Sequence, residues 1–277
     1  MSRNNKDEPV FERYRLSTNK KKIRIRDFDT RDKSCFPDRD EAEANATADI
    51  LAIAELQNRL YAEGKQALLI VLQATDTGGK DSTIRKVLGP INPQGVEVTS
   101  FKAPSSVELA HDYLWRIHQA VPAKGMIGVF NRSHYEDVLI VRVHDLAPRD
   151  KVEQRYDQIN EFERHLAEND VTILKFFLHI SKDEQKERLQ ARLDDPSKHW
   201  KFNPNDLKER ERWDEYEEAF ELALSRCSTK HAPWFVIPAD RKWYRNAVIA
   251  RIIRRTLEAM DPQYPEDSFD ASNIVID

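Results

Sequence analysis

The chain has 277 residues, 40% of them apolar and 33% charged, a composition that supports a sizeable core and does not resemble a disordered protein. Lys and Arg number 44 against 48 Asp and Glu, so the net charge of −4 argues against a protein with a generally basic, nucleic-acid-binding surface. Two cysteines, Cys35 and Cys227, are too few for a disulfide framework or a zinc site built on Cys pairs.

The amino-terminal segment, 1–39, is polar and contains a basic run of Lys20, Lys21, Lys22, Arg24 and Arg26. We expect a solvated arm here, with a polyanion-binding arm as the alternative. The segment has no apolar signal region, and the chain has no apolar stretch long enough to span a membrane, so we expect a cytoplasmic protein without a membrane partner. Apolar residues at helical spacing predict a helix from about 40 to 61.

Five short runs are candidate strands, and the first of them is nearly continuously apolar, as expected for a central strand that is covered on both faces of a sheet. They cover residues 66–73, 96–101, 126–131, 171–180 and 234–238. Helical apolar stripes lie between or after them, at 150–168, 207–224 and 242–258. The alternation predicts an α/β fold with a parallel sheet and helices on both faces, and no linker divides residues 1–277 into two domains. Functional residues are then expected just after the strands.

The first predicted strand leads directly into the sequence ATDTGGKDST, which partly matches the phosphate-loop pattern G-x-x-x-x-G-K-[ST]. Gly79 and Lys80 match, whereas Ala74 replaces the first Gly and Asp81 replaces the Ser or Thr. The motif predicts a set of phosphate-binding residues, namely Thr77, Gly78, Gly79, Lys80, Ser82 and Thr83. The alternative is a strand-to-helix turn that needs Gly only for its backbone angles.

Two carboxylates in this loop, Asp76 and Asp81, would repel a bare phosphate. They are compatible with phosphate binding if they hold a divalent cation that bridges to phosphate oxygens. We therefore predict Asp76 and Asp81 as ligands of Mg²⁺, the hard cation that oxygen ligands favour.

The third predicted strand ends in the sequence NRSHYED, at residues 131–137. Arg132 is expected to bind phosphate through its planar guanidinium, with a structural ion pair to Asp137 as the alternative. His134 is expected to be a packed histidine and not a catalyst. Glu136 lies close to Arg132 in sequence.

A basic stretch from about 188 to 207 is predicted to form a lid that closes over phosphates. Its cations are Arg188, Arg192, Lys198 and Lys201. A solvated loop is the alternative.

Four ordered motifs, ATDTGGKDST, FNRSHYEDVL, ERLQARLDDPSKHWKFNPNDLKER and APWFVIPADRKWYRN, together resemble the polyphosphate kinase 2 family, and specifically its subgroup that accepts AMP and ADP. The resemblance implies a three-layer α/β/α P-loop kinase fold. It also implies reversible, Mg²⁺-dependent transfer of a terminal phosphoryl group from inorganic polyphosphate to AMP or ADP, forming ADP or ATP. Homodimers or homotetramers are implied as well.

Through this resemblance Asp76, Lys80 and Arg132 are expected to be catalytic, and Asn131 stands where ADP-specific members have Asp. Nucleotide selectivity is expected to involve Asn131 and Glu136, with Phe101 and Lys102 near the adenine. Two alternatives remain open at this point: an ATP-dependent nucleoside or nucleotide kinase, and a non-catalytic polyphosphate or nucleotide sensor.

Overall fold

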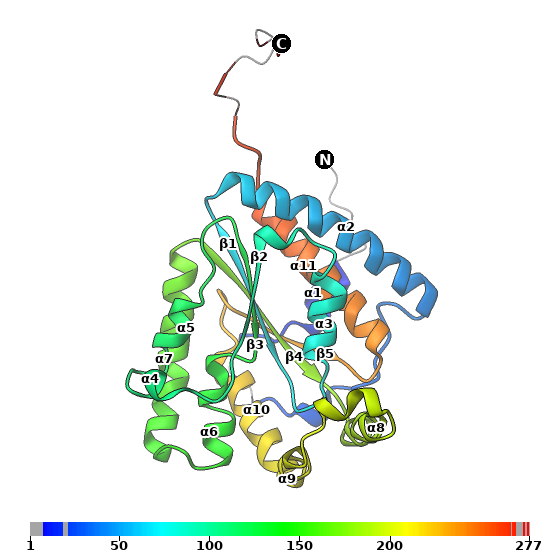
Figure 1. The fold of residues 1–277 in the computed structure, drawn as a ribbon, viewed down its shortest axis with the longest axis vertical. Coiled ribbons are helices and arrows are strands. Elements are labelled where there is room, and N and C mark those ends of the chain that lie inside the picture. Colours follow the sequence, from blue (N-terminus) through cyan, green and yellow to red (C-terminus); the bar gives the residue numbers. More distant parts are fainter. Residues whose placement is uncertain (1–7, 19–21, 267, 270–273, 275, 277) are drawn as a thin grey trace.

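The structure is a computed structural model that describes residues 8–18, 22–266, 268–269, 274 and 276. Five strands form one parallel sheet in the order β2-β3-β1-β4-β5 (Figure 1). The strands are β1 (Ala67–Gln73), β2 (Val96–Ser100), β3 (Ile127–Asn131), β4 (Val171–His179) and β5 (Trp234–Pro238). All five predicted strands are confirmed, each within one residue of its predicted limits at either end.

The central strand β1 shows why this sheet has helices on both faces. All seven of its residues are buried. Leu68, Ile70 and Leu72 pack into one core, whereas the alternate residues Leu69 and Val71 pack into the other. Because successive side chains of a strand point to opposite faces, a continuous apolar run requires cover on both sides.

One face is covered by α1 (Glu8–Tyr14), α2 (Arg39–Glu63), α3 (Lys80–Thr83) with the π-helical turn η2 (Ile84–Leu88), and α11 (Lys242–Met260). The other face is covered by α5 (Trp115–Gln119), α6 (Ile140–Val143), α7 (Arg149–Glu168) and α10 (Trp213–Cys227), with the short α4 (Ser106–Leu109) preceding α5 (Figure 1). The predicted helix at 40–61 is confirmed as α2, which Asp38 caps at its start and Gly64, at φ 63°, ends. The three-layer α/β/α P-loop kinase fold is thus confirmed.

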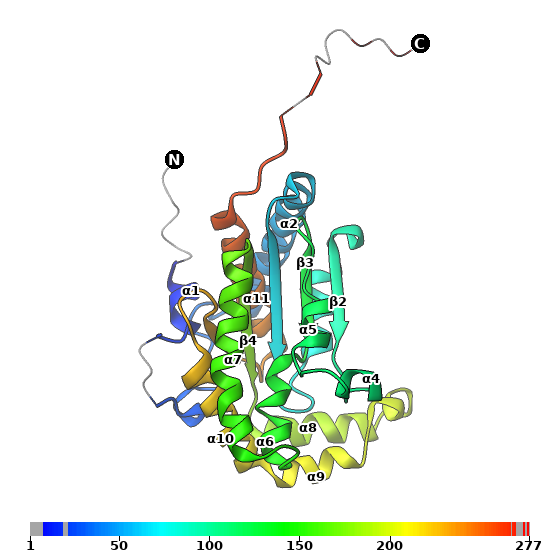
Figure 2. The ribbon, with the colours of Figure 1, turned by 90° about the vertical axis from the view of Figure 1, so that its left-hand side faces the viewer.

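A helical segment lies beyond the carboxyl ends of the strands, where the ligand of a parallel sheet is expected (Figure 2). It consists of α8 (Lys182–Leu193), the 3-10 turn η5 (Pro196–Lys201) and α9 (Asn205–Glu211). The single helix predicted at 207–224 is wrong, because the chain leaves helical geometry at Arg212, where ψ is 23°. The break separates α9, which lies with α8 and η5 beyond the strand ends, from α10, which packs into the core.

The amino-terminal segment is not a solvated arm over its described residues, 8–18 and 22–39. Leu16, Ile25 and Phe36 are buried in the two cores, and the Leu16 N–H donates to the Trp234 carbonyl at the free edge of β5. Arg26 pairs with Glu217, whereas Lys20 and Lys21 of the basic run lie outside the described residues. The segment therefore covers a sheet edge, which would otherwise expose unpaired backbone groups.

None of the helices within the described residues is both long and apolar enough to cross a membrane.

Candidate active site

The loop from β1 to α3 has the backbone of a phosphate-binding turn. Thr77 (φ 62°) and Gly79 (φ 104°) lie in the left-handed region, and the Gly78 N–H donates to the Thr75 carbonyl at 3.0 Å. A Cβ on Gly78 would lie 2.4 Å from the Ala74 Cβ, so Ala74 can replace the first Gly of the pattern only because Gly78 has no side chain. The loop is therefore intact despite its departure from the consensus.

Lys80 is the first residue of α3, and its Nζ donates to the Ala74 carbonyl at 3.2 Å across the mouth of the loop. Burial, and next the nearby Arg132, lower the pKa of its ammonium, while Asp76 favours the charged form. A phosphate group bound here would add negative charge next to Lys80 and so favour its ammonium form.

The end of β3 meets this loop side by side. The Asn131 amide donates to Asp81 at 2.7 Å, and Arg132 Nη2 donates to Asp76 at 3.2 Å. Arg132 has φ 63°, a strained angle for a residue with a Cβ, and its N–H donates to the Leu72 carbonyl. The parallel register of β1 and β3 thus brings the two predicted motifs into one site.

The contacts of Asp137 and His134 decide between the alternatives for the NRSHYED motif. Asp137 pairs with Arg155 at 3.2 Å and not with Arg132, so the structural ion pair considered for Arg132 is absent. His134 is buried and shares a hydrogen bond with the buried Glu163, which confirms the packed histidine. Glu163 also accepts from Lys175, so His134 belongs to a core network and not to the reacting centre.

A cleft of about 960 Å³, which we call the basic cleft, lies between the phosphate loop and the predicted lid. Eight cationic side chains line it, namely Lys80, Lys102, Arg132, Arg188, Arg192, Lys198, Lys201 and Lys242. Five acidic side chains line it as well: Asp76, Asp81, Glu184, Glu187 and Asp206. In a chain with a net charge of −4, this local excess of cations suits a polyanion.

The cations of the predicted lid differ in their hydrogen-bond partners. Arg188 donates to Glu184 and to the carbonyls of Thr77, Gly78, Ala239 and Asp240, so the structure places it as a brace for the loop.

Arg192 donates to the Lys201 carbonyl, and Lys198 pairs with Asp195 on an exposed turn. Lys201 extends over the exposed Trp200, with its Nζ 4.7 Å from the ring centre. These three cations line the cleft from the lid side.

A second hollow, of about 400 Å³, adjoins the cleft and has a different character. We call it the aromatic hollow, since Trp213, Tyr216 and Phe220 line it together with Leu139 and Ile140. Its acidic lining residues are Asp76, Glu136, Asp206 and Glu209, and Arg132 is the one cation among its described lining residues. The hollow thus combines an aromatic and aliphatic side with a polar, mainly acidic side, a combination that suits a small organic ligand with polar groups.

The two hollows share a wall that contains Asp76, Ala103, Arg132, Asn203 and Asp206. Asp206 was missed by sequence reasoning, and its pKa is raised by burial and then by the charge of Asp76. It belongs to the first turn of α9, which the sequence pattern did not separate from α10.

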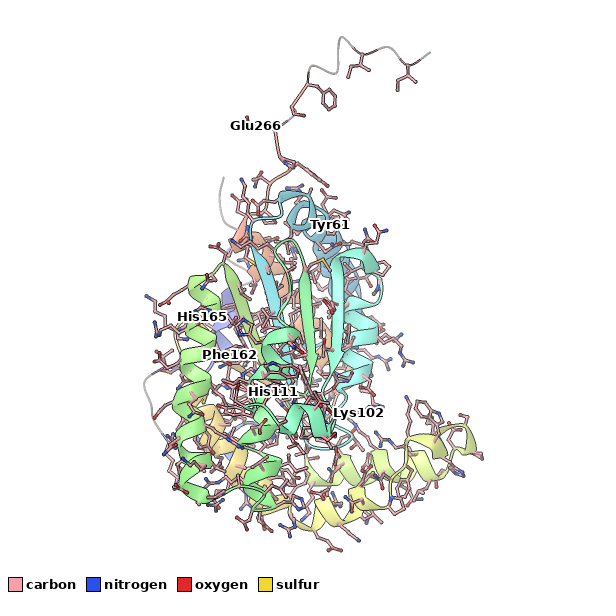
Figure 3. All side chains as sticks on the ribbon, turned by 60° about the vertical axis from the view of Figure 1, so that its left-hand side comes forward. Tyr61, Lys102, His111, Phe162, His165 and Glu266 are labelled. Atoms are coloured by element: carbon pink, nitrogen blue, oxygen red, sulfur yellow. The ribbon has the colours of Figure 1, made fainter. Side chains whose placement is uncertain are left out.

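The residues predicted for nucleotide selectivity do not lie together. Glu136 lines the aromatic hollow, whereas Asn131, Phe101 and Lys102 line the basic cleft. Phe101 is largely buried against Phe130, with ring centres 4.9 Å apart. Figure 3 shows Lys102 at the carboxyl-end side of the sheet, opposite the end where Tyr61 lies.

The predicted metal ligands can be tested against the chemistry of their surroundings. No group of three or more His, Cys, Asp or Glu side chains able to hold a metal occurs in the part of the chain that the structure describes. Asp76 and Asp81 both line the basic cleft beside the phosphate loop. Mg²⁺ in phosphoryl-transfer sites commonly uses one or two carboxylates and completes its shell with water and phosphate oxygens. The pair therefore fits a cation that arrives with a phosphate ligand.

Comparison with known proteins defines the class to which this fold and site belong. Residues 37–265 match the family model of polyphosphate kinase 2. The chain is 51% identical over 268 residues to an AMP/ADP-polyphosphate phosphotransferase of Meiothermus ruber, covering 96% of this chain and all of that one. It is 47% identical over 226 residues to an ADP-polyphosphate phosphotransferase of Rhodopseudomonas palustris, covering 77% of this chain and 78% of that one.

A crystal structure of polyphosphate kinase 2 from Arthrobacter aurescens TC1 is similar with a TM-score of 0.91 and 44% identity, over 95% of this chain and 94% of that one. The chain belongs to the polyphosphate kinase 2 family. The resemblance found in its motifs is thereby confirmed.

Proposed function

We propose that this protein transfers the terminal phosphoryl group of inorganic polyphosphate to AMP and ADP, forming ADP and ATP, in a reversible reaction. The observation that carries the proposal is the pair of adjoining hollows, one basic and one aromatic, that meet at Asp76 and Arg132. The names of the relatives from Meiothermus ruber and Rhodopseudomonas palustris support both nucleotides as acceptors.

In this proposal polyphosphate occupies the basic cleft and the nucleotide occupies the aromatic hollow. Lys80 and Arg132 neutralise charge on the phosphoryl group as it passes between the two ligands. Asp76, on the shared wall, orients the acceptor oxygen or holds the metal. The lid excludes water, which would otherwise compete with the nucleotide as acceptor.

We also propose Mg²⁺ as the cofactor, held by Asp76 and Asp81 together with phosphate oxygens. When bound, the cation neutralises phosphate charge and aligns donor and acceptor oxygens. We expect a chelator in excess over the metal to abolish product formation and added Mg²⁺ to restore it.

The test of the activity is product analysis by chromatography. The purified protein is incubated with Mg²⁺, polyphosphate and either AMP or ADP, with parallel samples that contain ATP in place of polyphosphate or a chelator. We expect ADP and then ATP to form from AMP only when both polyphosphate and metal are present. Turnover with ATP as sole donor would instead indicate an ATP-dependent nucleotide kinase, and polyphosphate binding without any product would indicate a sensor.

Glu136 provides a prediction about the choice between AMP and ADP. Its carboxylate lines the aromatic hollow and favours the charged form of Arg132. A carboxylate in this place repels ADP more strongly than AMP, because ADP carries an additional phosphate. We expect Glu136→Gln to lower the ratio of kcat/KM for AMP to kcat/KM for ADP about fivefold, an effect of about 1 kcal/mol. Steady-state kinetics with each nucleotide measures the ratio, and an unchanged ratio would remove Glu136 from the selectivity set.

We propose a homodimer or homotetramer, as the family resemblance implies, and a cytoplasmic location. Light scattering on the purified protein measures its mass in solution.

A further inference from the structure

An arginine outside the predicted motifs lies directly behind the phosphate loop. Arg245, in the first two turns of α11, has no exposed surface. Its Nη2 donates to the Ser82 hydroxyl at 3.0 Å, and its Nε and Nη2 donate to its neighbour Asn246 at 3.1 and 2.9 Å. Its Nη1 has no hydrogen-bond partner among the described residues.

Among the described residues, no carboxylate compensates the charge of this guanidinium. No carboxylate of the described residues forms an ion pair with Arg245, whereas Arg251, on the same helix, pairs with the buried Asp49 at 2.7 Å. Burial and the charge of Arg188 lower the pKa of Arg245 to about 9, which leaves it a cation at neutral pH. A buried, unpaired charge is costly for a folded protein, so a site that retains one is a candidate for function.

The contacts of Arg245 converge on one peptide unit of the loop. A Cβ on Gly79 would lie 2.0 Å from Nη1, so the guanidinium occupies the space that a side chain at this position would need. Ser82, which accepts from Arg245, donates in turn to the Gly79 carbonyl at 2.9 Å. The Thr83 N–H and hydroxyl donate to the same oxygen.

These bonds hold the Gly79 carbonyl toward α3. Because a peptide unit is planar and trans, the Lys80 N–H on the other side of it must point the opposite way. Gly79 and Ser82 line the basic cleft and do not belong to the lining of the aromatic hollow. Arg245 lines neither hollow itself, but the residues that it contacts, Gly79 and Ser82, lie on the side of the basic cleft.

We propose that Arg245 is a positioning residue for the phosphate loop: through Ser82 it fixes the Gly79–Lys80 peptide, and its unpaired charge strengthens polyphosphate binding in the basic cleft. This inference rests on the proposed assignment of the cleft to polyphosphate. The polyanion supplies the negative charge that no described residue provides next to Arg245.

The test replaces Arg245 by Met, which has similar length and no charge. We expect Arg245→Met to raise the KM for polyphosphate about fivefold or more, while the KM for AMP changes less than about twofold. The melting temperature without ligand is expected to stay the same or rise, since an uncompensated buried charge is removed. The increase in melting temperature on addition of polyphosphate is expected to be smaller for Arg245→Met than for the wild-type protein.

Two further variants sharpen the result. Arg245→Lys keeps the charge and is expected to retain a KM for polyphosphate closer to that of the unchanged protein than Arg245→Met does. Arg251→Met, the matched control on the same helix, is expected to show the opposite pattern. It lowers the melting temperature, because Asp49 loses a buried partner, and leaves both KM values unchanged.

A merely structural Arg245 would lower the melting temperature on replacement by Met and leave the KM for polyphosphate unchanged, and that result would overturn the proposal. So would an equal rise in both KM values, or an Arg245→Lys variant no better than Arg245→Met. The Lys80→Ala variant separates this failure from that of the proposed site. If Lys80→Ala is inactive while Arg245→Met is normal, only the role of Arg245 is lost, whereas an active Lys80→Ala contradicts the site itself.

Discussion

Replacement of Lys80 by Ala is expected to lower kcat for phosphoryl transfer from polyphosphate by about 10²–10³-fold, the usual effect of removing one preorganised group that stabilises the transition state. The ammonium lies at the mouth of the loop, where burial and Arg132 already lower its pKa. A phosphoryl group in the basic cleft would pair with this ammonium. Removal of the Lys80 side chain therefore affects the reacting centre directly. Initial rates of ADP formation from AMP measure the effect.

The control for this variant is Lys86→Ala, which removes an exposed lysine from η2, outside both hollows. We expect it to keep the rate of the unchanged protein. Both variants should retain the melting temperature, since Lys80 makes one hydrogen bond to a carbonyl and Lys86 is exposed. More than a tenth of the original activity in Lys80→Ala would show that Lys80 does not stabilise the transferred group.

Asp76→Asn is expected to produce the second large effect, a loss of about 10²-fold in kcat. The change keeps the size of the side chain but removes the charge that faces Arg132 at 3.2 Å on the wall between the two hollows. If Asp76 holds the metal, the Mg²⁺ concentration needed for half of the maximal rate also rises, because an amide binds the cation less well than a carboxylate. A Mg²⁺ titration of the rate measures both quantities.

Asp183→Asn is the matched control, since Asp183 is exposed in the first turn of α8 and lines neither hollow. Its rate and its Mg²⁺ dependence are expected to be unchanged. A loss of rate in Asp76→Asn with unchanged Mg²⁺ dependence would assign Asp76 to orienting the acceptor oxygen and leave Asp81 as the proposed ligand. Unchanged rate would contradict a catalytic Asp76 altogether.

The loop and the end of β3 could be predicted from sequence because their signals are local. Asp76, Lys80 and Asp81 follow one buried strand directly, and Arg132 follows another. Parallel strands bring their carboxyl ends to the same side of a sheet, so these residues were expected on that side, and the pairing of β1 with β3 brings them into contact. Their contacts, Asn131 with Asp81 and Arg132 with Asp76, agree with that reasoning.

Other parts depended on contacts between segments that are distant in sequence. The amino-terminal segment looked solvated because Leu16, Ile25 and Phe36 are isolated among charged residues, yet each finds a place in a core. Asp206 reaches the shared wall only because the chain breaks at Arg212 and turns α9 away from α10. No local pattern marks that break, since helical spacing of apolar residues continues on its far side.

The sequence by itself determined the parallel α/β architecture and the family, because alternating strands and helices and four ordered motifs are properties of short segments. Only the tertiary structure showed which cationic side chains hold the phosphate loop and which are available to a ligand. Arg188 and Arg245, 57 positions apart, both contact the phosphate loop, while Lys198 and Lys201 line the cleft from η5. The burial of an arginine and its hydrogen-bond partners decide whether it holds a backbone segment in place or is free to contact a ligand. Both depend on packing between elements, which sequence spacing does not reveal.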